Sequence, residues 1–493
     1  MTLLAGWLPR RDAPAAKPLR DELLGSSRLD ERALALAASL TVDPRRRRRP
    51  RDTSPRFEDN ARVLRAAYRM LADDVRTGQF VTPGAEWLLD NFHLVTSEVN
   101  GIRRNLPRAY YRSLPVLASR GHDGQARIYR LAVELIAHTD SRLDERQMAQ
   151  FLTDFQRVAP LTLGELWAWP SMLALALIEN LRRLADQLTL ARAARHAADR
   201  YLLRVAPASV PEPLHRLSSP AFVVQLLRRV REYGVRLSPI RIAVSEHLAA
   251  RHTTAEETIH GEHQRQAVAQ VSISNAITSL QLCARIDWQD FVEDVSLVEQ
   301  ALRRDPAGAY ADMDFLSRDE QRQAVESLAR DSGEAQLRVA LKAIENAREA
   351  AATAPPGARE AHVGYHLIDG GRANLESGLA HRPELRTRLT RLMLRHAAPL
   401  YVGAIAALTA GLVEASVWYA GLAGASRLLQ AIVALCVLLP ASALAVALVQ
   451  HGVMRVTRPR RLPRLQFRHG IPEASRSMVI VPTLLTGTSA VDS

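Results

Sequence analysis

Two long apolar stretches near the end of the chain constrain its fold more than any other feature. They cover residues 400–423, where Glu414 is the single formal charge, and residues 428–453. Each exceeds the roughly 20 residues that a helix needs to cross the hydrocarbon core of a bilayer. The connection at residues 424–427 is so short that the two helices must run antiparallel. The sequence therefore predicts a transmembrane helical hairpin, which we place at residues 396–456.

Arginines flank the predicted hairpin unevenly. The segment ahead of it holds Arg382, Arg386, Arg388, Arg391 and Arg395, and the segment behind it holds Arg455, Arg458, Arg460, Arg461, Arg464 and Arg468. The connection between the helices holds only Arg427. Because positively charged flanks stay on the cytoplasmic side, the pattern predicts a multi-pass chain with both termini in the cytoplasm.

Two residues inside the apolar stretches need an explanation of their own. Pro440 lies in the second one, where a neighbouring helix can satisfy the carbonyl that a proline kink frees. Glu414 is either a functional intramembrane carboxylate or a residue near the outer interface or paired with a helix. We favour the second interpretation.

Charge and composition suggest a different character for the first 53 residues. The chain holds 65 Lys and Arg against 52 Asp and Glu, a formal net charge of +13. Residues 1–53 are rich in Pro, Arg and Ala and contain five successive arginines, Arg45 to Arg49. We expect a disordered basic arm, with contact to anionic lipid as an alternative and nucleic-acid binding as a weaker one. No signal peptide is expected at the start, and two cysteines exclude a disulfide framework.

Residues 54–395 carry helical periodicity and predict a helical cytoplasmic domain. Ser54 and Thr82 are each followed by proline, which is typical of helix starts. The first expected helix covers residues 54–77 and has on one face Phe57, Ala61, Leu64, Tyr68, Leu71 and Val75. The second covers residues 83–105 and is expected to bury Trp87, Asn91, Leu94, Val95 and Ile102. Further helices are expected at residues 128–138 and from Asp144. No alternating strand pattern of similar length precedes the hairpin, so the region is predicted to be all-α.

Later segments of this region follow the same pattern. Thr162 and Glu165 have the spacing of a capping box, which we prefer to a catalytic acid at Glu165. An apolar helix follows at residues 167–181, and further helical periodicity includes Val268, Val271, Ile273, Ile277, Leu280 and Leu282. We expect a turn at residues 305–308, a helix from Arg318 and a loop at residues 351–359.

A search for catalytic motifs gives no convincing site. The chain has no G-x-x-x-x-G-K-[ST], no G-x-G-x-x-G after a strand and no G-x-S-x-G, which argues against a P-loop ATPase, a Rossmann dehydrogenase and a serine hydrolase. His260 and His263, with His252 nearby, lack an evident third zinc ligand. Asp312 and Asp314 form a D-x-D, but they precede Ser317, a candidate helix cap, so a loop or capping role is favoured. We therefore assign no catalytic, cofactor-binding or metal-ligating residue.

The last residues show a different pattern. Residues 478–485 form a short apolar run of β-rich type, which is how a first buried parallel strand opens an α/β domain. A lone buried strand leaves its backbone groups without partners. We expect either that the strand docks elsewhere or that residues 457–493 are the start of an incomplete α/β domain.

Several segments resemble, in order, the amino-terminal region of bacterial cyclic β-1,2-glucan synthases. They are residues 86–95 (EWLLDNFHLV), 102–117 (IRRNLPRAYYRSLPVL), 134–144 (ELIAHTDSRLD), 161–185, 262–280, 295–322, 362–376 (HVGYHLIDGGRANLE) and 478–486 (MVIVPTLLT). The resemblance runs from about Phe57 to Ala490. Two positions depart from the family pattern, namely the turn at residues 369–371 and Asp312, where a basic residue is more usual.

The resemblance implies a very large enzyme of the bacterial inner membrane, with a transferase part that uses UDP-glucose and a divalent metal, and with further glycan-processing domains. In that family the transferase begins at a stretch like residues 478–486. The resemblance therefore implies that residues 457–493 are the truncated start of a glycosyltransferase domain, whose ligands would lie beyond Ser493. We therefore expect a mainly α chain that anchors such a synthase and is inactive alone, with the bilayer and the downstream domains or a partner chain as its partners. The alternative is a self-sufficient membrane-anchored scaffold for a partner glycosyltransferase.

Overall fold

The computed structural model confirms a mainly α-helical chain and divides into two compact units, Met1–Leu297 and Val298–Ser493. It describes residues 17–42, 50, 54–118, 124–204, 219–233, 238–355, 357–379, 393–456, 462–467, 470–471, 473 and 476–477. Within these ranges there are isolated β-bridges but no β-strand. The predicted strand at residues 478–485 lies outside the described residues, as do the arginines 45–49.

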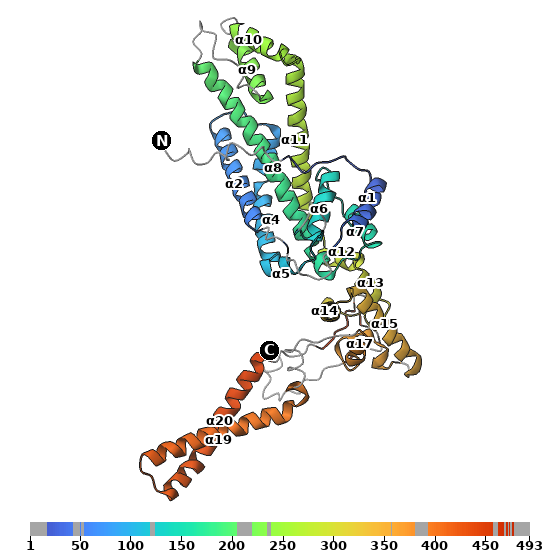
Figure 1. Ribbon diagram of the computed structural model, residues 1–493, viewed down its shortest axis with the longest axis vertical. Coiled ribbons are helices and arrows are strands. Elements are labelled where there is room, and N and C mark those ends of the chain that lie inside the picture. The colour runs from blue at the N-terminus through green and yellow to red at the C-terminus, as the bar shows by residue number, and fades with distance from the viewer. Residues whose placement is uncertain are drawn as a thin grey trace, which may run out of the picture. The chain divides into compact units, whose positions relative to one another are not determined.

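The first unit is built around one long helix (Figure 1). Its helices are α1 (Ser26–Ser39), α2 (Ser54–Arg76), α3 (Pro83–Asp90), α4 (Phe92–Asn105), α5 (Arg108–Ser113), α6 (Arg127–His138), α7 (Glu145–Gln156), α8 (Leu163–Arg204), α9 (Pro220–Tyr233), α10 (Ser238–Ala249), α11 (Ala255–Cys283) and α12 (Trp288–Val295). The helix α8 has 42 residues and packs against α2, α4, α6, α9 and α11. At 1.5 Å per residue it is about 60 Å long.

The core of this unit follows from the apolar composition of the first half of α8. Trp169, Leu173 and Leu177 have almost no exposed surface, and leucines of α2 and α6 pack against the same helix. Near the other end of α8, α9 and α10 enclose a smaller cluster that contains Ala198 and Phe222. The predicted apolar run of residues 167–181 is thus the buried half of a longer helix.

The predicted disordered arm at residues 1–53 is wrong for the segment that forms α1. Leu29, Ala33 and Leu36 of this helix are buried in the core of the first unit, and α1 packs against α7. The spacing of these three residues places them on one helical face, and Leu and Ala are strong helix formers. A bias toward Pro and Arg in the surrounding sequence hid this short amphipathic segment.

Other expectations needed smaller corrections. The helix expected after Thr82 is divided at Asn91, whose side-chain amide bonds to the Trp87 carbonyl at 3.0 Å. Trp87, which we expected to be buried, is 37% exposed. Three valines that follow the helical periodicity are also exposed, namely Val75, Val268 and Val271. Helical periodicity alone did not reveal which face has a neighbour.

The second unit contains a small helical group and an apolar hairpin. Its helices are α13 (Leu297–Leu302), α14 (Phe315–Ser332), α15 (Gln336–Thr353), α16 (Val363–Ile368), α17 (Arg372–Gly378), α19 (Ala397–Leu422) and α20 (Arg427–Val456). Val325, Val339 and Leu367 are fully buried in the helical group. The turn predicted at residues 305–308 is present, but α14 begins three residues before Arg318 and α15 includes residues 351–353, where we expected a loop.

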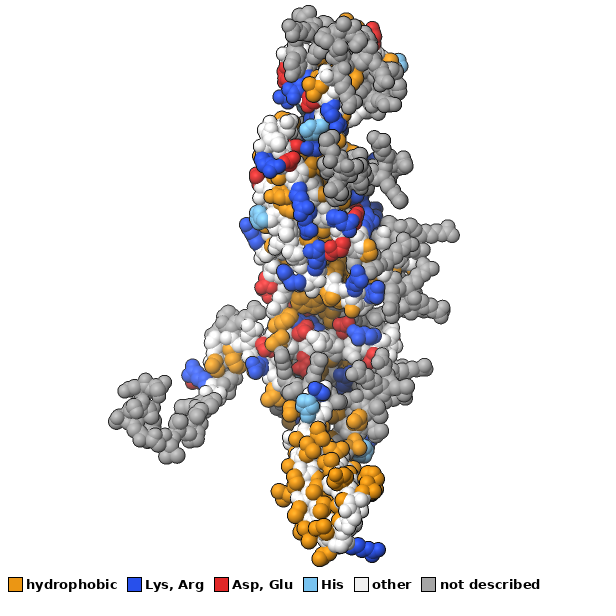
Figure 2. Space-filling view, turned by 90° about the vertical axis from the view of Figure 1, so that its left-hand side faces the viewer, with side chains coloured by type: hydrophobic (Ala, Val, Ile, Leu, Met, Phe, Trp, Pro, Cys, Tyr) orange, Lys and Arg blue, Asp and Glu red, His pale blue; other side chains and the backbone are white. Residues whose placement is uncertain are grey.

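The helices α19 and α20 pack against each other and form the predicted antiparallel hairpin (Figure 1). Both are long and apolar enough to cross a membrane, and only 6% and 11% of their most apolar windows is buried. Thr409 of α19 and Ala441 and Ala445 of α20 are the buried residues described in the pair. Small residues at these positions let the two backbones approach closely. Figure 2 shows that hydrophobic side chains cover the hairpin.

Candidate functional site

The D-x-D motif has a local structural role. The Asp314 carboxylate accepts a hydrogen bond from the backbone N–H of Ser317 at 2.9 Å and so caps α14. The hydrogen bonds from the Ser317 hydroxyl and from the Ser317 N–H, with Arg464 and Arg318 nearby, hold the pKa of Asp314 below its ordinary value. The predicted capping role is confirmed, although the cap is Asp314 and not Ser317.

Glu165 joins a capping box to a buried ion pair. Its carboxylate accepts from the Thr162 N–H at 2.9 Å, and the Thr162 hydroxyl accepts from the Glu165 N–H at 3.2 Å, which confirms the predicted capping box. The same carboxylate accepts two hydrogen bonds from Arg127 of α6, at 2.8 and 2.6 Å. Glu165 is fully buried and therefore needs this cationic partner.

A second buried carboxylate, Glu179, ties α2 to α8. It accepts hydrogen bonds from Arg56 and Asn60 of α2, and from Arg183 one turn along α8 at 2.9 Å. Burial pushes the pKa of Glu179 upward, but the hydrogen bonds from Arg56, Asn60 and Arg183 outweigh it and leave the pKa below its ordinary value. The carboxylate is held ionised as a structural link between helices.

The second unit holds a comparable cluster around Glu299. Its carboxylate accepts from the Tyr310 hydroxyl at 2.7 Å, from Arg322 at 3.0 Å and from Arg303 at 3.0 Å. Burial and the Glu299 charge raise the pKa of Tyr310. Asp305 of the neighbouring turn accepts from the Val363 N–H at 2.8 Å. These bonds join α13, α14 and α16 around buried polar groups.

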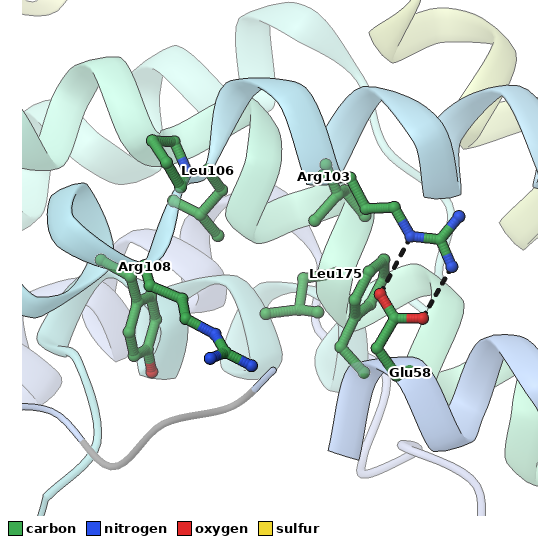
Figure 3. Close-up of a pocket in the computed structure, with 9 residues that line it drawn as sticks. Glu58, Arg103, Leu106, Arg108 and Leu175 are labelled. Carbon is green, nitrogen blue, oxygen red and sulfur yellow. Dashed lines mark hydrogen bonds and ion pairs between the residues drawn. The ribbon is translucent and has the colours of Figure 1, made fainter. Parts of the chain in front are cut away.

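One small pocket opens between α2, α4, α5 and α8 (Figure 3). At one side Arg103 donates two hydrogen bonds to Glu58, at 2.9 and 2.7 Å, and holds the pKa of Glu58 below its ordinary value. Figure 3 shows Arg108 on the other side of Leu175 from this ion pair. The pocket volume is about 200 Å³, below the roughly 300–1,000 Å³ of typical small-molecule sites. It is too small to enclose a nucleotide sugar.

The histidines singled out in the sequence do not meet a third metal ligand. His260 lies on α11, where its ring contacts the Gln264 amide at 2.9 Å. His252 lies in the turn before this helix, with a φ of +54°. In the part of the chain that the structure describes, no three His, Cys, Asp or Glu residues are grouped as a metal site requires.

The buried cysteine, Cys283, is not activated for nucleophilic chemistry. Burial raises the pKa of the Cys283 thiol to about 12, so the reactive thiolate is scarce at neutral pH. The other cysteine, Cys436, is exposed on α20. Neither cysteine resembles an activated nucleophile.

Two further sequence features have a defined place in the second unit. A Cβ on Gly371 would come within 2.7 Å of the His366 ring and 2.8 Å of the Tyr365 ring, so this turn requires glycine. In the hairpin, Glu414 is exposed on the surface of α19, and does not face α20 as part of the buried contact.

Comparison with known proteins gives one informative match. A scan against models of protein families finds none that matches the chain. The cyclic beta-(1,2)-glucan synthase NdvB of Rhizobium meliloti (strain 1021) is 32% identical over 459 residues, which cover 90% of this chain. The chain is related to the cyclic beta-(1,2)-glucan synthases. It spans 16% of the length of that curated relative.

This relationship to the glucan synthases confirms the resemblance inferred from the sequence. Glu165, Glu179 and Glu299 each have arginine partners that join neighbouring helices. Sequence reasoning found the cap at Glu165 but missed Arg127, Arg56 and Tyr310, since no local spacing links them to their carboxylates. An ionisable residue at an otherwise apolar helix position, such as Glu179, was the one available signal.

Proposed function

We propose that this chain is the amino-terminal, membrane-anchoring part of a cyclic β-1,2-glucan synthase of a bacterial inner membrane. The observation that carries the proposal is the 32% identity over 90% of the chain, to a region that makes up 16% of the relative. Two adjacent helices that are long and apolar enough to cross a bilayer support an anchoring role.

The arginine distribution supports an orientation with both ends in the cytoplasm. Arg395 lies just ahead of α19 and Arg455 lies in the last turn of α20, whereas the turn between the helices is followed by Arg427 alone. Positive residues at the two outer ends favour the cytoplasmic side. The helices outside the hairpin would then lie in the cytoplasm, the compartment that supplies UDP-glucose.

We assign sugar transfer to parts of the synthase outside the matched region. The buried carboxylates described above are engaged by arginines, and the pocket between α2 and α8 is too small for UDP-glucose. Under this proposal the UDP-glucose site, its divalent metal and the glycan-processing domains belong to downstream domains or to a partner chain. The chain alone is then catalytically silent.

Topology is tested with reporter fusions in a bacterial host. Alkaline phosphatase, which is active only in the periplasm, is fused after Ser477 in one variant and inserted between Gly424 and Ala425 in another. We expect activity from the insertion in the turn and none from the fusion after Ser477. The reverse result would contradict the orientation, and activity at neither position would contradict membrane crossing.

Catalytic silence is tested with membranes that contain the chain and radiolabelled UDP-glucose. We expect no label in protein or glucan, whereas membranes with the Rhizobium meliloti relative serve as the positive control. Labelled glucan formed by the chain alone would overturn the assignment of sugar transfer to other regions.

A further inference from the structure

A short extended segment ahead of α14 pairs with the chain that follows the second apolar helix. The N–H of Asp314 donates to the Arg464 carbonyl at 2.8 Å, and the N–H of Gln466 donates to the Asp312 carbonyl at 2.7 Å. These two bonds flank an antiparallel bridge between Met313 and Leu465. The D-x-D residues therefore supply backbone partners to a segment that lies beyond α20.

Side chains of α14 hold the extended segment at residues 311–314 in place. Arg318 is buried and donates from one guanidinium nitrogen to the Met313 carbonyl at 2.8 Å and to the Ala311 carbonyl at 3.3 Å. Gln321 reaches the Met313 sulfur at 3.1 Å. The carbonyls of residues 311 and 313 thus bond to Arg318, which leaves the Asp312 carbonyl and the Asp314 N–H directed to the incoming segment.

The cap of α14 adds a third contact to the same segment. Because the Asp314 carboxylate accepts from the Ser317 N–H, the Ser317 side chain is not needed as the cap. Its hydroxyl instead accepts from the N–H of Arg464 at 2.9 Å, across 147 residues of sequence. Three hydrogen bonds, two from backbone to backbone and one to a hydroxyl, therefore hold residues 464–466.

We propose that residues 311–317 are a dock for the segment that leaves the second membrane helix. The contact closes a loop that contains α14, the helices after it and the whole hairpin, so the helical group determines where the chain beyond residue 466 begins. The occupant is residues 464–466 of this same chain. The consequence for a glucan synthase, that the dock positions the downstream transferase, rests on the proposed function.

The pairing itself is tested by disulfide formation between Met313→Cys and Leu465→Cys, in a full chain with Cys283→Ala and Cys436→Ala and in native membranes. A pair flanked in this way is of the non-hydrogen-bonded type, with Cα atoms about 4.5 Å apart. That separation lies within the range of disulfides. We expect an intramolecular disulfide under mild oxidation, identified by mass spectrometry of the linked peptides.

The matched control keeps Met313→Cys and replaces Leu462 with cysteine instead. Three residues of extended chain place this position roughly 10 Å farther along, beyond the reach of a disulfide. We expect at least about a fivefold lower yield than for the first pair. Equal yields, or no disulfide in the first pair, would overturn the dock.

A second test removes one backbone bond without changing the helical group. Gln466→Pro lacks the N–H that bonds to Asp312, whereas Gln466→Ala keeps it. We expect the proline variant to lower the yield of the disulfide severalfold and to speed hydrogen exchange at the Asp314 and Arg464 amides. The alanine variant should change neither quantity, and equal behaviour of the two variants would contradict the proposal.

Failure of the dock and failure of the proposed function are separable. A disulfide between positions 313 and 465 in a chain whose alkaline phosphatase fusions show the opposite orientation would retain the dock and reject the membrane assignment. The predicted orientation without the disulfide would do the reverse.

Discussion

Single residues in the first unit carry charges that the core could not hold without their partners. Arg127 and Glu165 are both buried and lie on different helices, and Arg127 donates two hydrogen bonds to the Glu165 carboxylate. Removal of one member of such a pair leaves an uncompensated charge in a medium of low dielectric, which costs more than the pair itself contributes.

We expect Arg127→Met to lower the free energy of unfolding by about 3–5 kcal/mol, because Glu165 then stays buried without its cation. The double variant Arg127→Met/Glu165→Gln should lose less, since glutamine keeps the capping box and carries no charge. Urea unfolding of the detergent-solubilised chain, followed by tryptophan fluorescence, measures both. A single variant no less stable than the double one would refute the argument.

Glu179 makes stability depend on pH in a defined direction. Its pKa in the folded chain lies below the ordinary value of 4.5, so its stabilisation is complete above that value and is lost as the pH falls through the folded pKa. Glu179→Gln should therefore be less stable near neutral pH and lose less stability as the pH falls from neutral to below 4.5. Urea unfolding across this pH range is the measurement, and parallel curves for the two chains would contradict the prediction.

Elements near the start of the chain show how a short helix is fixed by the core. Leu29 of α1 is fully buried, whereas Leu23, just before this helix, is 53% exposed. We expect Leu29→Ala to cost about 2–5 kcal/mol through the cavity it leaves. Leu23→Ala should stay within about 0.5 kcal/mol of the unchanged chain. Equal midpoints of unfolding for these two variants would support the original prediction that this segment is disordered.

Local signals predicted elements well where they were self-contained. The helix at residues 128–138, the capping box at Thr162 and the apolar hairpin each depend on neighbouring residues, and the structure places all three where we expected them. The division at Asn91 and the length of α8 depend on packing against other helices. Periodicity specifies a face but not the neighbour that covers it.

The candidate sites were predictable to a smaller degree, for the same reason. The sequence predicts a loop or capping role for Asp312 and Asp314 next to Ser317 as the candidate cap, and the structure shows that Asp314 is the cap. The sequence pattern does not predict the pairing of residue 313 with residue 465, because nothing in either segment indicates a partner so distant in sequence. Long-range contacts of this kind require the fold.

The whole molecule consists of two helical units, and the second unit includes a hairpin of two long apolar helices. We expect the chain to stay in the membrane pellet after extraction with alkaline carbonate, and a variant without residues 397–456 to be released. Each apolar helix is long enough to span a bilayer, and two together make dissociation very slow. Release of the unaltered chain would argue against membrane insertion.

The position of α19 also sets the order of events during synthesis. At about 5–20 residues per second, a ribosome needs at least roughly 20–80 s to make the chain that precedes Ala397. The buried arginine–glutamate ion pairs of the first unit can form within that interval, before the apolar helix α19 leaves the ribosome. If α19 and α20 cross the bilayer as proposed, the first unit therefore has time to fold before they are inserted.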